Sequence, residues 1–479
     1  MSAAGSVSAV TPVTDVGAEP VAEAARRRRA RTRRRPGGTA DWTEAHVRRL
    51  FWRAGFGATP VEARRWARRG RAATIDFVVD GPRGGARLRG PAPRVEGRPL
   101  DPVNEWGHDV LWWLDRMVRS THPLREKLTL FWHDHFATAD QDTPLMLSQN
   151  RLLRRHALGS FRALLGDVTR DPAMQLFLSL AGSTKDAPNE NFARELMELF
   201  TLGGGYSERD VREASRALTG YVTDWSERDG VSIRYEADEH DDGVKRVLGR
   251  AGRFGVDDVL DLVCAHPRHA PFLVTKLWEL FVATPPSRAT VRSLAATYRG
   301  SGLQVEPVVR EILDHPVLYR RLDAPDLVKS PVVYVAGALR TTGSYVSDGY
   351  PTWLLAQMGQ ELFRPPSVAG WDGGAAWMSS NTMRQRFTLA NYVVGYGRPR
   401  VRKGAYPASL TPAEAFLRAY RAVGEPQISR RTQRALTRLA ANWFDDIDRR
   451  WRDEADWRAD ALQMTLRHLL IAGPDSQLC

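Results

Sequence analysis

The sequence lacks the features that define several common classes of protein. It contains only two cysteines, Cys264 and Cys479, which excludes a disulfide-stabilised domain. Its apolar runs, such as residues 111–114, are far shorter than the roughly 18 residues that a membrane-spanning helix needs. It has no glycine-rich phosphate loop, no His-Glu-x-x-His zinc helix and no Gly-x-Ser-x-Gly elbow. The common ATPase, zinc protease and serine hydrolase classes therefore lose their main support.

Lysine is scarce as well. The chain has six lysines against 63 arginines, and its net charge is +13. Eight of the arginines lie within residues 26–35, and without them the charge is +5. Residues 1–40 carry no aromatic side chain and bury too little apolar surface to fold, so we predict a disordered tail rather than a nucleic-acid-binding arm. No apolar segment of 7–15 residues follows the arginines, so the sequence as written predicts a cytoplasmic protein without a secretory signal.

The rest of the chain, residues 41–479, predicts a mainly α-helical fold. Thr59 and Thr411 each precede a proline and, three residues on, a glutamate, which is the pattern of a capped helix start. Apolar residues spaced by three and four predict many further helices, among them residues 147–168 and 189–202. Because these signals continue almost without a gap, we expect one large multi-helical domain, with a division into two lobes as the alternative.

Strand signals are sparse. The exception is residues 221–250, where Asp229-Gly230 separates two stretches that contain β-branched and aromatic residues. This pattern predicts a small β-hairpin. Residues 81–102 and 395–407 are rich in glycine, proline and arginine and are interpreted as surface loops.

The densest group of polar residues lies in residues 189–203. On a helix, one polar stripe would contain the four candidate catalytic residues Asn191, Arg194, Glu195 and Glu198. Two carboxylates beside a guanidinium are typical of a metal site or of an acid and base pair with separated pKa values. The alternative is an ordinary amphipathic helix with an exposed Arg–Glu pair.

Two shorter segments contain candidate metal ligands. His133 and His135 lie two residues apart and would point to different sides of a helix, so they share one ion only if the helix ends there. His240 and Asp241 precede a glycine in a turn that is able to ligate a divalent cation. In each case the alternative is structural: a helix cap for the histidines, and for the aspartate a bond to its own backbone.

A loop over residues 364–377 combines a Pro-Pro step with three glycines and two tryptophans. Such a loop is able to present Trp371, Trp377 and Arg364 to a ligand. In the alternative interpretation, the tryptophans fill the core.

Taken together and in this order, these segments resemble the bacterial family catalogued as domain of unknown function 1800. The resemblance also includes residues 46–57 and 216–220, and it extends from about residue 41 to the last residue. It implies a helical protein without an established activity, whose gene often neighbours that of an exported sulfatase-like protein. Many relatives carry twin-arginine-type signals, whereas this chain has the arginines without the apolar segment.

Two functions follow as hypotheses. In the first, the stripe of residues 191–198, one of His133 and His135, and His240 with Asp241 converge on a pocket that holds a divalent metal and supports hydrolase-like chemistry. In the second, the protein is a non-catalytic binding or assembly protein that works with the sulfatase-like partner. An open cleft over the stripe favours the enzyme, and a sealed, hydrogen-bonded network favours the assembly protein.

Overall fold

The computed structural model describes residues 42–226, 230–407, 409–443 and 455–479. The predicted tail over residues 1–40 lies outside the described residues. Within them the chain is mainly helical with small antiparallel sheets, which confirms the predicted fold class. No helix in these parts of the chain is long and apolar enough to cross a membrane.

The helices divide into three groups along the chain. The first group is α2 (Glu44–Arg53), α3 (Pro60–Arg69), α4 (Arg71–Asp80), α5 (His108–Arg119), α6 (Pro123–His135), α7 (Thr143–His156), α8 (Phe161–Thr169) and α9 (Pro172–Phe177). The second is α10 (Asn191–Glu195), η2 (Leu196–Leu202), α11 (Glu208–Ala217), η3 (Ala237–Glu239), α12 (Val256–Ala265), α13 (His269–Phe281), α14 (Arg288–Gly300), α15 (Val305–Leu313) and η4 (Pro316–Tyr319). The third is α16 (Pro331–Thr342), α17 (Tyr350–Gln357), η5 (Gly374–Met378), α18 (Ser380–Tyr396), α19 (Pro412–Ala422), α20 (Arg430–Asn442), α21 (Ala455–Ala472) and α22 (Pro474–Gln477).

The two predicted capping boxes are confirmed. The Thr59 hydroxyl accepts a hydrogen bond from the Glu62 amide at 3.3 Å, and the Glu62 carboxylate accepts one from the Thr59 amide at 3.0 Å. Thr411 and Glu414 repeat this exchange at the start of α19. Each box pairs backbone amides that the first turn of a helix would otherwise leave without partners.

The helix predicted over residues 147–168 is wrong in its extent, because two helices occupy it. The first, α7, ends at His156. Ser160 then caps α8, since its hydroxyl accepts from the Ala163 amide at 3.3 Å. A serine side chain in this position offers the backbone an alternative to continuing the helix, and apolar spacing alone does not detect it.

Three two-stranded antiparallel sheets occur among the described residues: β1 (Arg94–Val95) with β2 (Arg98–Pro99), β3 (Tyr221–Ser226) with β4 (Gly230–Tyr235), and β5 (Lys245–Val247) with β6 (Arg250–Gly252). The pair β3–β4 confirms the predicted hairpin, although the residues of its turn, 227–229, are not described. The other two pairs were not predicted. Their turns place a non-glycine residue before the glycine, Glu96 (φ 51°) and Leu248 (φ 49°), where the usual signal is asparagine or aspartate.

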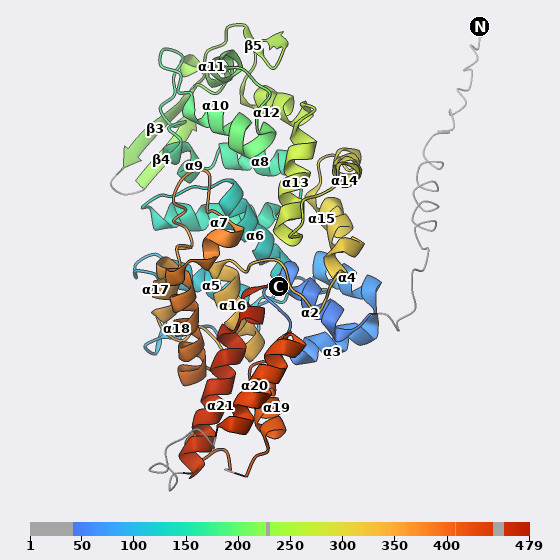
Figure 1. Ribbon diagram of the computed structural model, residues 1–479. Coiled ribbons are helices and arrows are strands. Elements are labelled where there is room, and N and C mark those ends of the chain that lie inside the picture. Colours follow the sequence, from blue (N-terminus) through green and yellow to red (C-terminus); the bar gives the residue numbers. More distant parts are fainter. Residues whose placement is uncertain (1–41, 227–229, 408, 444–454) are drawn as a thin grey trace, which may run out of the picture.

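Two clusters of buried apolar side chains form the interior. One is built on α2–α4, α8 and η2–α15, and the other on α5 and α16–α21. Helix α6 contributes to both: Leu124, Leu128 and Trp132 face the first cluster and Leu130 faces the second. Figure 1 shows α6 and α7 in the middle of the molecule, between β3–β6 at one end and α19–α21 at the other. Side chains at the end of α6 therefore meet elements from both halves.

Candidate functional site

The segment predicted as one helix over residues 189–202 changes its geometry halfway. The α-helix α10 ends at Glu195, and the π-helix η2 continues from Leu196 to Leu202. A π-helix takes one more residue in each turn, which shifts every following side chain around the axis. Glu195 is half-buried and Glu198 is exposed. The predicted stripe therefore extends over two kinds of helix, with Glu195 at the end of α10 and Glu198 in η2.

Three consecutive carbonyls at the end of η2 each accept a hydrogen bond from a basic side chain. The pairs are Lys276 Nζ with Leu199 O at 3.3 Å, His135 Nε2 with Phe200 O at 3.0 Å, and His269 Nδ1 with Thr201 O at 3.1 Å. Helix ends leave their last carbonyls without intrahelical partners. Here α6 and α13 supply those partners.

Both histidines are neutral near pH 7. Burial lowers the pKa of His269 to about 4, and burial together with Lys276 holds the pKa of His135 well below its usual range. Because a carbonyl only accepts, the proton lies on Nε2 of His135 and on Nδ1 of His269. The other ring nitrogens then accept, from Lys276 Nζ at 3.3 Å and from the Tyr298 hydroxyl at 3.0 Å. We call His135, His269 and Lys276, together with the three carbonyls, the η2 centre. Its hydrogen bonds determine the tautomers of the two histidines.

Asp134 connects the same end of α6 to the predicted ligand loop. Its Oδ1 accepts a hydrogen bond from the Trp371 amide at 2.8 Å. Burial raises the pKa of Asp134 to about 6, while Lys276 opposes this shift. Gly370 has φ of 81°, and a Cβ there would lie 2.3 Å from Asp134 Oδ1. Only glycine therefore allows the loop to approach the helix this closely.

His133 points away from His135, as two residues of spacing on a helix require. Its ring is 1% exposed and packs near Trp113, Phe363 and Trp371, with centroids 5.3, 5.9 and 5.6 Å away. Burial lowers its pKa to about 3, so the ring is neutral. Its Nε2 has no hydrogen-bond partner among the described residues. The two histidines do not meet at one ion.

The predicted ligand-binding residues of the loop are mostly turned inward. Trp371 and Trp377 are 9% and 8% exposed, so their rings fill space in the interior. Arg364 is half-exposed and pairs with Asp109 at 3.2 Å and with Glu361 at 3.3 Å.

The charged residues of α10 form an ion-pair group at the surface. The Arg194 guanidinium binds Glu208 through two bonds of 2.9 and 2.8 Å and Glu190 through one of 3.1 Å. The Tyr206 hydroxyl donates to Glu198 at 3.2 Å. Burial and the neighbouring Glu198 raise the pKa of Glu195. Asn191 is exposed, and its amide donates to the side chain of Asn189 at 2.9 Å.

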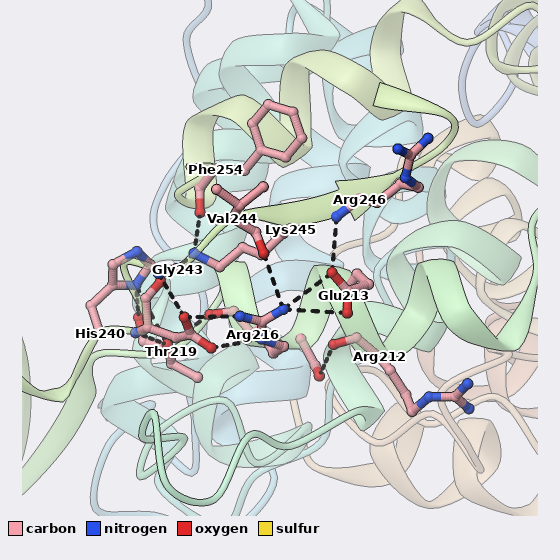
Figure 2. A network of polar contacts seen from close by, with 12 residues as sticks. Arg212, Glu213, Arg216, Thr219, His240, Gly243, Val244, Lys245, Arg246 and Phe254 are labelled. Carbon is pink, nitrogen blue, oxygen red and sulfur yellow. Dashed lines mark hydrogen bonds and ion pairs between the residues drawn. The ribbon is translucent and has the colours of Figure 1, made fainter. Parts of the chain in front are cut away.

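His240 and Asp241 belong to a different network, at the C-terminal end of α11 (Figure 2). Arg216 binds both oxygens of Asp241, at 2.6 and 3.2 Å, and reaches Glu213 at 3.1 Å. The buried Lys245 donates to the carbonyls of Asp241 and Phe254. Nδ1 of His240 lies 3.0 Å from the Thr219 carbonyl. This α11 network attaches the β5–β6 hairpin to the helix.

The four predicted metal ligands therefore lie in three separate places: His133, His135, and the α11 network with His240 and Asp241. In the parts of the chain that the structure describes, no group of three or more His, Cys, Asp or Glu side chains could hold a metal ion. The structure does bring the end of α6, η2 and the loop over residues 364–377 together around Asp134. It also adds Lys276 and His269, which the sequence analysis missed.

The scarcity of lysine in the sequence could have indicated some of the residues that were not predicted. Of the six lysines, Lys127, Lys245 and Lys329 are buried and Lys276 is half-buried. Burial lowers the pKa of all four. A chain that otherwise uses arginine places lysine where a compact ammonium group fits between carbonyls.

Comparison with known proteins assigns a family and no activity. Neither the curated proteins nor the solved structures include a match to this chain. Residues 49–478 match a family described as "Protein of unknown function (DUF1800)". The match covers nearly all of the described residues, and the chain therefore belongs to this family.

Proposed function

We propose that this protein is a non-catalytic binding or assembly protein. The observation that carries the proposal is the set of hydrogen bonds that the basic side chains around η2 make. Lys276, His135 and His269 each bond a main-chain carbonyl, so these groups hold three elements together. A hydrogen-bonded network of this kind fixes helix packing, whereas a catalytic group needs atoms that face the substrate.

Two arginines at or near the predicted site residues support the same interpretation. Arg194 already binds two carboxylates, and Arg216 binds Asp241 through two bonds. A guanidinium paired in this way would have to break those bonds before it could orient an anionic substrate.

A partner would bind on a group of four aromatic rings formed by α17 and α18, of which Tyr392 is buried and the other three are exposed. Trp353 stacks on Tyr350 at 5.4 Å, Tyr350 lies 5.1 Å from Tyr392, and Tyr392 lies 5.9 Å from Tyr396. Trp353 and Tyr396 are 41% and 78% exposed. Tyrosine and tryptophan are enriched in the centres of protein interfaces, where they bury much area at little entropic cost. We name these four residues the aromatic surface and propose the sulfatase-like partner as its occupant.

Binding to the purified sulfatase-like protein tests the proposal. We expect a complex by calorimetry, and a Trp353→Ala/Tyr396→Ala variant to lose about 30-fold or more in affinity. Phe387→Ala is the matched control, because Phe387 is 41% exposed on the same helix α18 but packs against His468. The absence of a complex, or an equal loss in the control, would overturn the proposal.

A hydrolase-like enzyme is the second candidate. Asp134 favours it, because its raised pKa of about 6 beside Lys276 suits an acid–base group. Elemental analysis of wild type beside Glu195→Ala and His135→Ala separates the two candidates. Near-stoichiometric metal in wild type, lost in both folded variants, would support the enzyme. If both variants bind as little metal as wild type and only melt earlier, the assembly protein is supported.

A further inference from the structure

A small cavity lies where α2, α16 and α21 meet the last residues of the chain. Its volume is about 50 Å³. Its lining includes Trp52, Lys329, Tyr334, Thr341, Asp475 and Ser476. A site of this size holds a few water molecules or an organic molecule of similar bulk. Figure 1 shows the C-terminal end of the chain close to α16 and α2.

Lys329 is the one amine in the wall of this cavity. The residue is 5% exposed, and its Nζ donates a hydrogen bond to the Ser476 carbonyl at 2.8 Å. The same nitrogen lies 3.6 Å from the centre of the Trp52 ring. No described carboxylate lies within ion-pair distance of it. Asp475, which also lines the cavity, accepts a hydrogen bond from the Ser429 amide at 2.6 Å.

The surroundings of Lys329 favour the neutral amine over the ammonium ion. Burial, together with Arg386, lowers the pKa of Lys329 to about 7, and Cys479 opposes this shift. Arg386 is fully buried, and its guanidinium lies over the Tyr334 ring at 4.8 Å. The face of the Trp52 ring instead stabilises the ammonium form of Lys329, because an aromatic face attracts a cation. A pKa of about 7 is far below the ordinary value for lysine, so a free amine is available near neutral pH.

We propose that Lys329 is a nucleophile that forms a Schiff base with a small aldehyde or ketone entering this cavity. The amine nitrogen attacks the carbonyl carbon, and a carbon–nitrogen double bond replaces the carbon–oxygen double bond. The carbonyl oxygen leaves as water and takes both amine protons with it. No oxidant, reductant or metal is needed, and hydrolysis reverses the step.

The choice of residue supports this chemistry. A lysine becomes nucleophilic when it is desolvated or stands beside another cationic group, and Lys329 meets both conditions. Arginine stays protonated in proteins and could not replace it. The chain uses arginine 63 times and keeps lysine here. This inference is independent of the proposed assembly function.

Reductive trapping with a small aldehyde tests the proposal. The full chain is treated with propanal and cyanoborohydride near pH 7, and peptide mass spectrometry measures alkylation at each of the six lysines. We expect Lys329 to react at least about tenfold faster than the exposed Lys185 and Lys403, with half of its maximal rate near pH 7. Pyridoxal phosphate, which is too large for the cavity, should instead label the exposed lysines.

Two variants and a denatured sample complete the test. Lys329→Met should remove the fast site and leave the other lysines unchanged. Lys127→Met is the matched control, because Lys127 is also buried and has a lowered pKa but does not line this cavity. Unfolding should abolish the preference. The proposal is overturned if Lys329 reacts no faster than the exposed lysines, if it reacts only after unfolding, or if pyridoxal phosphate prefers it.

Discussion

The η2 centre and the α11 network serve the same purpose by different chemistry. Both use polar side chains to bond the main chain of a neighbouring element. The η2 centre does so with two imidazoles and one lysine in the interior. The α11 network uses charged pairs, with the Arg216 and Asp241 side chains 30% and 18% exposed.

The difference shows how burial selects the chemistry of a contact. Removing two charges from water costs several kcal/mol for each ion, which a buried pair recovers only with additional hydrogen bonds. A neutral imidazole avoids most of that cost and still provides one donor and one acceptor. Near the surface, solvent reduces the cost, and a charged pair with two parallel bonds becomes favourable.

The largest effect is expected from His135→Ala. The substitution leaves the Phe200 carbonyl without its partner and opens a cavity in the interior, so we expect a loss of about 3–4 kcal/mol in the free energy of unfolding. His240→Ala in the α11 network should cost only about 1 kcal/mol, because His240 is half-buried. Chemical denaturation followed by circular dichroism measures both. Equal losses would contradict the contrast between the two regions.

The pH dependence of stability should identify the buried imidazoles. His269 has a pKa of about 4 in the folded protein and an ordinary value of 6.5 when unfolded, so between these values the unfolded chain binds more protons. Its contribution is complete above about pH 6.5 and is lost as the pH falls toward about 4, by up to about 3 kcal/mol. We therefore expect wild type to lose more stability over this range than His269→Gln. Parallel curves of melting temperature against pH for the two proteins would refute this assignment.

Asp241→Asn should have an intermediate effect. It removes the charge that Arg216 binds through two bonds, and we expect a loss of about 1–2 kcal/mol in thermal or chemical unfolding. The neighbouring Asp242→Asn is the control, because its side chain is 89% exposed and should change stability by less than about 0.5 kcal/mol. A similar loss at both positions would show that the Arg216 pair is not the cause.

The smallest effect is expected from Arg194→Gln. The ion pairs of Arg194 are largely exposed, and exposed pairs contribute about 0–1 kcal/mol and are screened by salt. Melting in low and high salt should show a small difference from wild type that shrinks as salt is added. A large loss that does not depend on salt would mean that Arg194 acts as a packing residue instead.

Much of the local structure could be predicted from the sequence, because its causes are local. Thr59 and Thr411 mark helix starts through bonds that span three residues. The β3–β4 hairpin follows from the alternation of β-branched and aromatic residues. The break before α8 was missed because apolar spacing continues across residues 157–160. The β5–β6 hairpin was missed because its turn begins with a leucine at positive φ.

The sequence by itself determined the fold class, the family and the segments that hold unusual polar residues. Tertiary structure alone decided what those residues do. The segment with Glu198 continues as a π-helix, and His133 and His135, two residues apart on α6, pack against different aromatic side chains. Lys276 lies 141 residues from His135, and Ser476 lies 147 residues from Lys329. Contacts over such separations depend on how helices pack, and helix periodicity in one segment carries no information about its distant neighbours.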